Sequence, residues 1–136
     1  MLVFCCNVNH AIETCKKFAD KGYPVKFISS GKSIPKKPDV DAKQGKHEEY
    51  LENLKDYENF VENYRKYSGK RKEVTNWFSN TKGAILVNVE MLTKGYDESS
   101  IEVVALNRAT LSITLFLQMI GRGARIDHNK SNFTLF

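Results

Sequence analysis

Two arginines near the end of the chain have the chemistry and spacing of an anion-binding group. The segment QMIGRGAR, residues 118–125, places Gln118, Arg122 and Arg125 at positions i, i+4 and i+7. On a helix over residues 112–125, this spacing directs the three side chains to one face. Arginine stays charged, and its planar fork matches the oxygens of a phosphate. The same spacing also suits a solvated basic helix face, so both interpretations stay open.

The same predicted helix carries an apolar face and two glycines. The face expected to pack on the core, opposite the arginines, consists of Ile113, Phe116, Leu117 and Ile120. Gly121 and Gly123 each cost a helix about 1 kcal/mol relative to alanine. We therefore expect another group to approach the backbone closely at these glycines.

A loop with possible phosphate and sugar ligands follows a buried strand. In VNVEMLTKGYD, residues 87–97, the strand ends shortly before Thr93, Gly95 and Asp97. Ligands of parallel α/β sheets bind beyond the carboxyl ends of the strands. Thr93 and Gly95 can donate to phosphate, and Asp97 can accept from a sugar hydroxyl. The alternative is an ordinary turn capped by Asp97.

Two further segments resemble parts of a nucleotide site but lack the required context. The GKS at residues 31–33 follows a strand, yet Lys26 stands where a phosphate-binding loop needs glycine, and Pro35 argues against a following helix. The segment YDESS resembles a magnesium-binding acidic box but follows a polar loop. We expect no complete triphosphate site and no metal ligands in this chain.

The remaining segments predict an α/β fold with a mostly parallel sheet. Apolar runs at residues 2–6, 24–29, 83–89 and 101–106 indicate strands, and NFTLF opens a last one. Two helices between them have apolar stripes made of Ala11, Cys15, Phe18 and Ala19, and of Val74, Trp77 and Phe78. The first strand, helix and second strand form a βαβ unit, whose strands are parallel.

Residues 31–66 differ in composition and predict a helical insertion. A polar loop with two prolines precedes the helix HEEYLENLKDYENFVENYRKY. The apolar stripe of this helix consists of Tyr50, Leu54, Tyr57, Val61 and Tyr64. We expect the stripe to pack on the parent domain, while a coiled-coil partner is the alternative.

Length and composition indicate one globular domain. We expect it to be cytoplasmic, and associated with the nucleoid if the source is bacterial. The formal charge of +5 is compatible with a polyanionic partner without requiring one. Membrane-span and signal-peptide patterns are absent from the sequence. We expect Cys5, Cys6 and Cys15 to be small buried residues, with Cys5 and Cys6 on opposite strand faces. Strands at both ends suggest a piece of a longer protein.

The second half of the chain contains a strand, LTKGYD, a second strand and a helix ending in QMIGRGAR. This order of segments resembles motifs V and VI of superfamily 2 helicases and translocases. The opening LVFCCNVNHAIE is similar to their motif IV. The resemblance covers residues 1–30 and 67–136 and leaves the insertion unexplained. It implies that residues 1–136 are the second, C-terminal RecA-like domain, with three layers. EMLTKGYD and the leading glutamine look closer to DNA translocases of the restriction-subunit and repair-helicase kind.

In this family ATP and Mg²⁺ lie between two RecA-like domains, and the N-terminal domain supplies the phosphate loop and the magnesium carboxylates. The resemblance implies that Arg125 is the arginine finger, that Arg122 contacts the γ-phosphate and that Gln118 helps to place them. Further implied nucleotide contacts are Gly95, Asp97 and Gly121. The isolated chain would then bind ATP poorly and hydrolyse none.

The resemblance implies a nucleic-acid partner, which we expect to be DNA. The nucleic acid crosses both domains and is held mostly by its phosphates. The implied contacts in this chain are Asn7, Ser68, Gly69, Lys70 and Thr93. Two alternatives stay open. One is an RNA helicase, and the other is a non-catalytic RecA-like module that binds nucleic acid or a partner protein.

Overall fold

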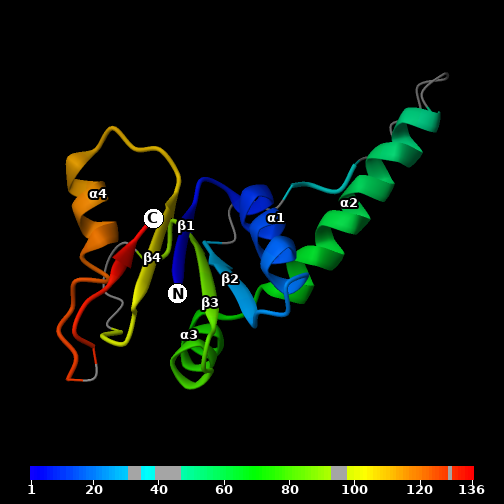
Figure 1. Ribbon diagram of the computed structural model, residues 1–136. Helices are drawn as coiled ribbons and strands as arrows, with labels where there is room; N and C mark the ends of the chain where they lie inside the picture. Colours follow the sequence, from blue (N-terminus) through cyan, green and yellow to red (C-terminus); the bar gives the residue numbers. More distant parts are fainter. Residues whose placement is uncertain (31–34, 39–46, 93–97, 129) are drawn as a thin grey trace.

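The protein is described by a computed structural model that covers residues 1–30, 35–38, 47–92, 98–128 and 130–136 (Figure 1). The strands are β1 (Leu2–Cys5), β2 (Val25–Ser29), β3 (Ile85–Val89), β4 (Val103–Asn107) and β5 (Thr134–Leu135). The helices are α1 (Val8–Ala19), α2 (His47–Tyr67), α3 (Arg71–Asn80) and α4 (Ile113–Ile120).

A single parallel sheet organises these elements. Its strand order is β2-β3-β1-β4-β5, and each neighbouring pair is parallel. The connection from β1 through α1 to β2 exists as predicted, but β3 lies between the two strands, so this crossover skips one position. The predicted α/β class with a parallel sheet is confirmed.

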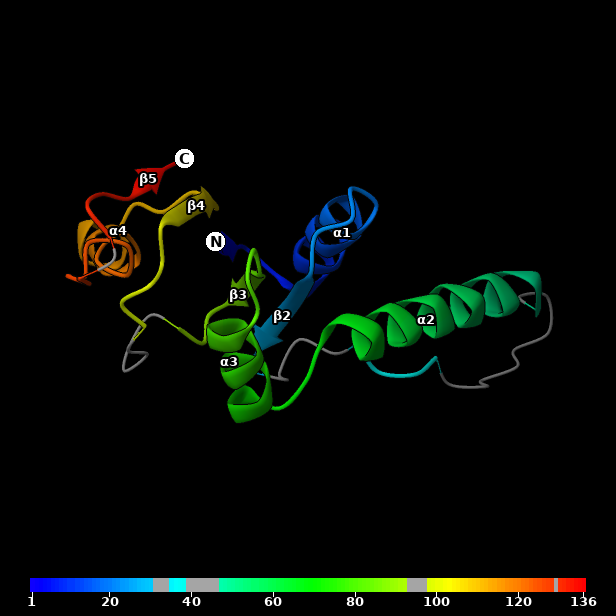
Figure 2. The ribbon, with the colours of Figure 1, turned by 60° about the horizontal axis from the view of Figure 1, so that its bottom comes forward.

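Helices cover both faces of the sheet, which explains why the strands are apolar on both sides (Figure 2). On one face, α1 and the last turns of α2 pack against a core that includes Val3, Cys5, Phe27 and Val87. On the other face, α3 and α4 pack against a core that includes Leu2, Phe4, Ile28 and Val104. Alternate residues of β1 therefore belong to different cores, and all of its side chains are buried.

The predicted helix α2 is present and its carboxyl-terminal part packs on the domain, but of the predicted stripe only Tyr64 joins the core. Phe60, Tyr64 and Tyr67 join the core beneath it. The ring of Tyr64 meets that of Phe27 edge-on at 5.2 Å between centroids, and its hydroxyl lies 3.4 Å from Ser29 Oγ. The amino-terminal turns of α2 extend away from the sheet (Figure 1). Among the described helices, none is long and apolar enough to cross a membrane.

The three cysteines have two different environments. Cys5 and Cys15 are fully buried, whereas Cys6 is exposed, so the expectation that all three are buried is wrong for Cys6. Cys6 lies just beyond the end of β1, and the prediction that it faces the side opposite Cys5 stays a prediction. Burial raises the pKa of Cys15 to about 12. Burial also raises the pKa of Cys5, against the opposing effect of hydrogen bonds from Thr14 and Asn107.

The native chain should therefore have one fast-reacting thiol at mildly alkaline pH. The thiolate is the nucleophile, and burial keeps Cys5 and Cys15 both protonated and inaccessible. Iodoacetamide labelling followed by mass spectrometry should place the fast modification on Cys6. Cys6→Ser should remove this fast reaction, and Cys15→Ser should leave it unchanged. Rapid labelling of Cys15 in the folded chain would contradict the described core.

Candidate functional site

The helix that leads to the two arginines is shorter than predicted. Ser112 caps α4 by accepting a hydrogen bond from Leu115 N at 3.2 Å. The α-helix ends at Ile120, and residues 121–125, which we call the arginine turn, follow it. Gly123 N donates to Ile120 O at 2.9 Å, an i→i+3 bond typical of a tightened last turn. The prediction of a helix through residue 125 is therefore wrong.

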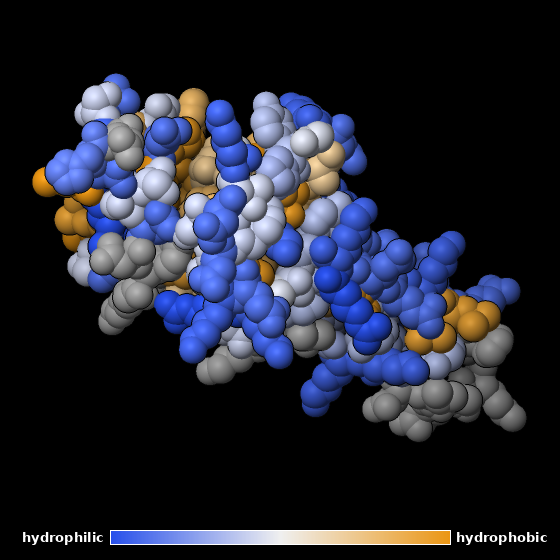
Figure 3. All heavy atoms as spheres, turned by 90° about the horizontal axis from the view of Figure 1, so that it is seen from below, coloured by the Kyte–Doolittle hydropathy of each residue, from blue (hydrophilic) through white to orange (hydrophobic). Residues whose placement is uncertain are grey.

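The buried side of α4 also differs from the predicted one. Met119 is fully buried, and Leu115 packs against the same core. Ile113 and Leu117 were expected to face the core, but they are 69% and 59% exposed. Six of the eight residues of ITLFLQMI are apolar, so Leu115 and Met119 can supply the inward side in place of Ile113 and Leu117. Seen from below, the surface is mainly hydrophilic, with separate small hydrophobic areas at both ends of the molecule (Figure 3).

The three predicted phosphate ligands do not share one outward face. Arg122 is only 8% exposed, because it follows Met119 by three residues and so lies on the buried side. Gln118 and Arg125 are half-buried, and their side chains are partly accessible to solvent. Both arginines also interact with other groups of the chain. Arg125 is thus the more accessible of the two guanidinium groups.

The predicted close approach to a glycine occurs at Gly123, and it comes from within the chain. A Cβ atom at Gly123 would lie 2.5 Å from Phe133 Cδ2 and 2.8 Å from Val104 Cγ2. This glycine lets the arginine turn pack against β4 and the residue before β5. At Gly121, the nearest atom to such a Cβ is Leu117 O of the same helix, at 3.1 Å.

The other predicted nucleotide loop lies outside the described residues. This applies to Thr93, Gly95 and Asp97. The structure does describe how the chain leaves β3 toward that loop. Asn88 is buried, and its Oδ1 accepts hydrogen bonds from Met91 N at 3.0 Å and Leu92 N at 2.9 Å. Sequence reasoning missed this residue, although an asparagine inside the apolar strand ILVNV is itself unusual.

The acidic residue after that loop takes part in a hydroxyl network. Glu98 accepts hydrogen bonds from Ser79 at the end of α3 and from Ser100 Oγ at 2.6 Å. Partial burial would raise the pKa of Glu98, but the hydrogen bonds from the two serines outweigh it and lower that pKa. The hydrogen bonds of Glu98 therefore connect α3 to the segment that enters β4.

The predicted nucleic-acid contacts lie on different parts of the sheet. Asn7 follows β1 and caps α1, its Oδ1 accepting from His10 N at 2.9 Å. Ser68 forms a parallel bridge with Phe27 of β2, and Lys70 directly precedes α3. The Lys70 side chain is 88% exposed, with Nζ 4.0 Å from Glu73 Oε1. Since β3 separates β1 from β2, these two groups are not adjacent.

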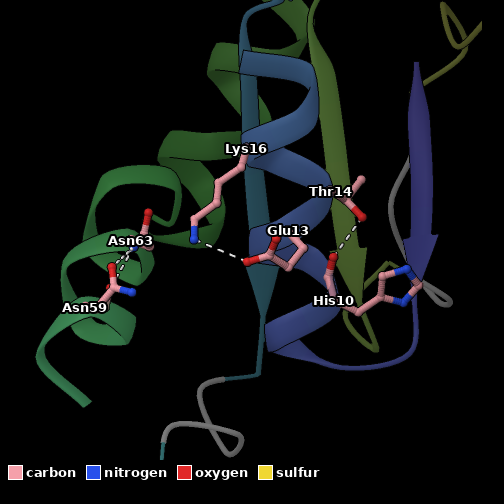
Figure 4. A network of polar contacts seen from close by, with 6 residues as sticks. All are labelled: His10, Glu13, Thr14, Lys16, Asn59 and Asn63. Carbon is pink, nitrogen blue, oxygen red and sulfur yellow. Dashed lines mark hydrogen bonds and ion pairs between the residues drawn. The ribbon is translucent and has the colours of Figure 1, made fainter. Parts of the chain in front are cut away.

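A polar cluster that sequence reasoning missed lies beside Asn7. At the carboxyl end of β4, Asn107 Nδ2 is 2.8 Å from His10 Nε2 and 3.5 Å from Thr14 Oγ1. The Thr14 hydroxyl also donates to His10 O at 2.7 Å within α1 (Figure 4). These residues lie 93 or more positions apart in the chain from Asn107, so no local pattern could have joined them.

Comparison with known proteins gives the family. The helicase conserved C-terminal domain matches residues 36–127. The chain belongs to this helicase family. Its sheet and flanking helices are accordingly those of the RecA-like domain that the motifs predicted. The matched region begins inside the segment interpreted above as an insertion.

One curated relative is similar over part of this domain. It is the candidate ATP-dependent helicase IRC3 of Saccharomyces cerevisiae, which is 36% identical over 63 residues. The alignment covers 46% of the chain and 9% of the yeast protein. The chain therefore spans only a small part of the relative that it matches.

The close packing at Gly123 predicts that alanine will destabilise the chain there. Gly123→Ala should lower the free energy of unfolding by about 1–3 kcal/mol, because the added methyl overlaps Phe133 and Val104. Gly121→Ala is the matched control, and it should change that free energy by less than about 1 kcal/mol. Urea unfolding followed by far-UV circular dichroism measures both values. Equal losses in the two variants would contradict the packing at Gly123.

Proposed function

We propose that this chain is the second motor domain of an ATP-dependent DNA helicase or translocase. The observation that carries the proposal is the arginine turn of a helicase C-terminal domain, with a buried Arg122 and, three residues later, a partly accessible Arg125. Membership of the family establishes the helicase-type domain. DNA as the substrate, and a role for the domain in DNA repair, belong to this proposal.

The proposed chemistry assigns a separate role to each residue of the arginine segment. Arg125 would be the arginine finger, because a fixed cation beside a transferring phosphoryl group neutralises the charge that develops there. Arg122 would contact the γ-phosphate, which a guanidinium group can bind through two oxygens. Gln118 would orient this pair, and Gly121, Gly95 and Asp97 would contact the rest of the nucleotide.

The donor set fits one half of a triphosphate site. It provides cations for terminal phosphate oxygens, which is the chemistry that guanidinium groups supply. Among the described residues there is no group of three or more His, Cys, Asp or Glu side chains that could hold a metal ion. Following the family resemblance, we assign Mg²⁺ and the phosphate loop to an N-terminal RecA-like domain of the same polypeptide. The isolated chain should accordingly hydrolyse no ATP.

The proposed nucleic-acid track uses Asn7 and the segment before α3, with Thr93 as a further contact. Asn7 and Lys70 both precede helices, and Lys70 carries an accessible charge suited to a phosphate. Ser68 and Gly69 would contribute hydroxyl and backbone donors at the same place. DNA is preferred over RNA because EMLTKGYD and the glutamine before the arginines resemble DNA translocases.

Arg125→Ala in the longer protein that carries this domain should abolish ATP hydrolysis stimulated by nucleic acid, because loss of an arginine finger lowers the rate by about 10³-fold or more. The domain should stay folded, since Arg125 is only half-buried. Steady-state ATPase assays with single-stranded DNA and with RNA of the same sequence measure the effect. Arg65→Ala, an exposed arginine on α2, is the matched control. Turnover near that of the native protein in Arg125→Ala would refute the finger assignment.

Lys70→Ala should weaken nucleic-acid binding without changing sequence preference. If Lys70 neutralises one phosphate, the slope of log K against log salt should become less steep by about 1. Fluorescence anisotropy with a labelled single-stranded DNA, repeated over a salt series, gives this slope. Lys82→Ala, another exposed lysine near α3, should leave the slope unchanged. Equal slopes for the native protein and Lys70→Ala would show that Lys70 does not contact a phosphate of the nucleic acid.

A further inference from the structure

Lys130 makes an unusual set of hydrogen bonds that neither the motifs nor the family match assigns. Its ammonium group donates to three backbone carbonyls, Ser99 O at 2.6 Å, Ile101 O at 3.2 Å and Gly123 O at 2.9 Å. An ammonium has three N–H donors, so these acceptors can use all of them. The residue is partly buried, which makes its charge-assisted bonds stronger than those of a solvated lysine.

These carbonyls belong to two segments that are distant in sequence. Gly123 lies in the arginine turn, whereas Ser99 and Ile101 lie in the segment that leads into β4. That segment follows directly on the loop at residues 93–97, which the motifs assign to the nucleotide. Lys130 therefore joins the arginine turn to the segment that follows the loop of the other proposed nucleotide contacts.

A short turn presents the lysine to these carbonyls. Lys130 N donates to Asp127 O at 3.1 Å, and the two residues form an antiparallel bridge. Asp127 Oδ2 in turn accepts from Ser99 Oγ at 2.7 Å. Ser99 is thus held by Lys130 through its carbonyl and by Asp127 through its hydroxyl, which restrains the segment before β4 at two atoms.

We propose that Lys130 is a positioning residue that holds the arginine turn against the segment entering β4. The carbonyls after a helix end have no intrahelical partner, and Lys130 satisfies that of Gly123. Its compact ammonium reaches three separate acceptors, which the planar fork of an arginine does not match. The consequence for Arg125 rests on the proposed function, in which the geometry of this turn sets the position of the finger.

The first test uses amide hydrogen exchange in the 136-residue chain and needs no ATPase activity. In Lys130→Met the amides of Gly123 and Ala124, which donate to Ile120 O, should exchange about tenfold faster or more. Amides of β3, an interior strand of the sheet, such as those of Leu86 and Val87, should change by less than about twofold. Lys82→Met, at an exposed lysine, should change neither group.

Equal acceleration in the arginine turn and in β3 would overturn the proposal, because it would show a general loss of stability. Unchanged exchange at Gly123 and Ala124 would also overturn it. If Lys130→Met does not fold, Lys130 supports the whole domain and the local role is wrong. Lys130→Arg keeps the charge but not the three-point geometry, and it should accelerate exchange in the turn less than methionine does.

The second test connects Lys130 to Arg125 in the longer protein. Lys130→Met should lower kcat for ATP hydrolysis by about tenfold or more, since small misplacement of a catalytic group has effects of this size. The KM for ATP should change by less than about threefold. In an Arg125→Lys background the same substitution should have a smaller effect, because both changes act on one group. Full additivity would overturn the positioning role.

The two tests separate this inference from the proposed function. If Arg125→Ala leaves the ATPase intact, the finger assignment fails, while hydrogen exchange still decides whether Lys130 holds the turn. If Arg125→Ala abolishes activity but Lys130→Met changes neither exchange nor kcat, the function stands and the role of Lys130 is refuted.

Discussion

The pairing of β1 along both of its edges is the constraint on which the rest of the structure depends. Leu2, Val3 and Phe4 pair with β3 on one side, and the same strand pairs with β4 on the other. The side chains of β1 are also buried on both faces, so a shift in register would break both ladders and repack both cores. Its carboxyl end therefore lies beside that of β4, and this places His10 of α1 against Asn107.

The arginine turn depends on the same frame through β4. Gly123 packs on Val104 and Phe133, and Lys130 binds the carbonyl of Gly123 together with two carbonyls before β4. Arg122, the residue before Gly123, is buried, and Arg125, two residues after Gly123, is half-buried. A charged group that must meet a phosphate at a fixed distance benefits from such a support, because rigid placement reduces the reorganisation required during the reaction.

The accuracy of the sequence-based predictions follows from how sharply polar residues interrupt each apolar pattern. In α1 the stripe of Ala11, Cys15 and Phe18 alternates with charged residues, and the structure buries or half-buries that side. In α4 nearly every residue is apolar, so the pattern allowed several inward faces and the predicted one was wrong. No local pattern indicated the roles of Asn107 and Lys130, because Asn107 meets side chains of α1 and Lys130 binds backbone carbonyls of two other segments.

The sequence by itself determined the parallel α/β class, the presence and order of the four helices and the resemblance to the family to which the chain belongs. These features depend on local periodicity and on short motifs, which a linear pattern records directly. Only the tertiary structure decided that Arg122 is buried and that Phe133 packs where a side chain at position 123 would lie. It also decided that the Lys130 ammonium binds three backbone carbonyls. The physical reason is that these contacts join segments brought together by sheet pairing, and no spacing along the chain specifies which backbone atoms then become neighbours.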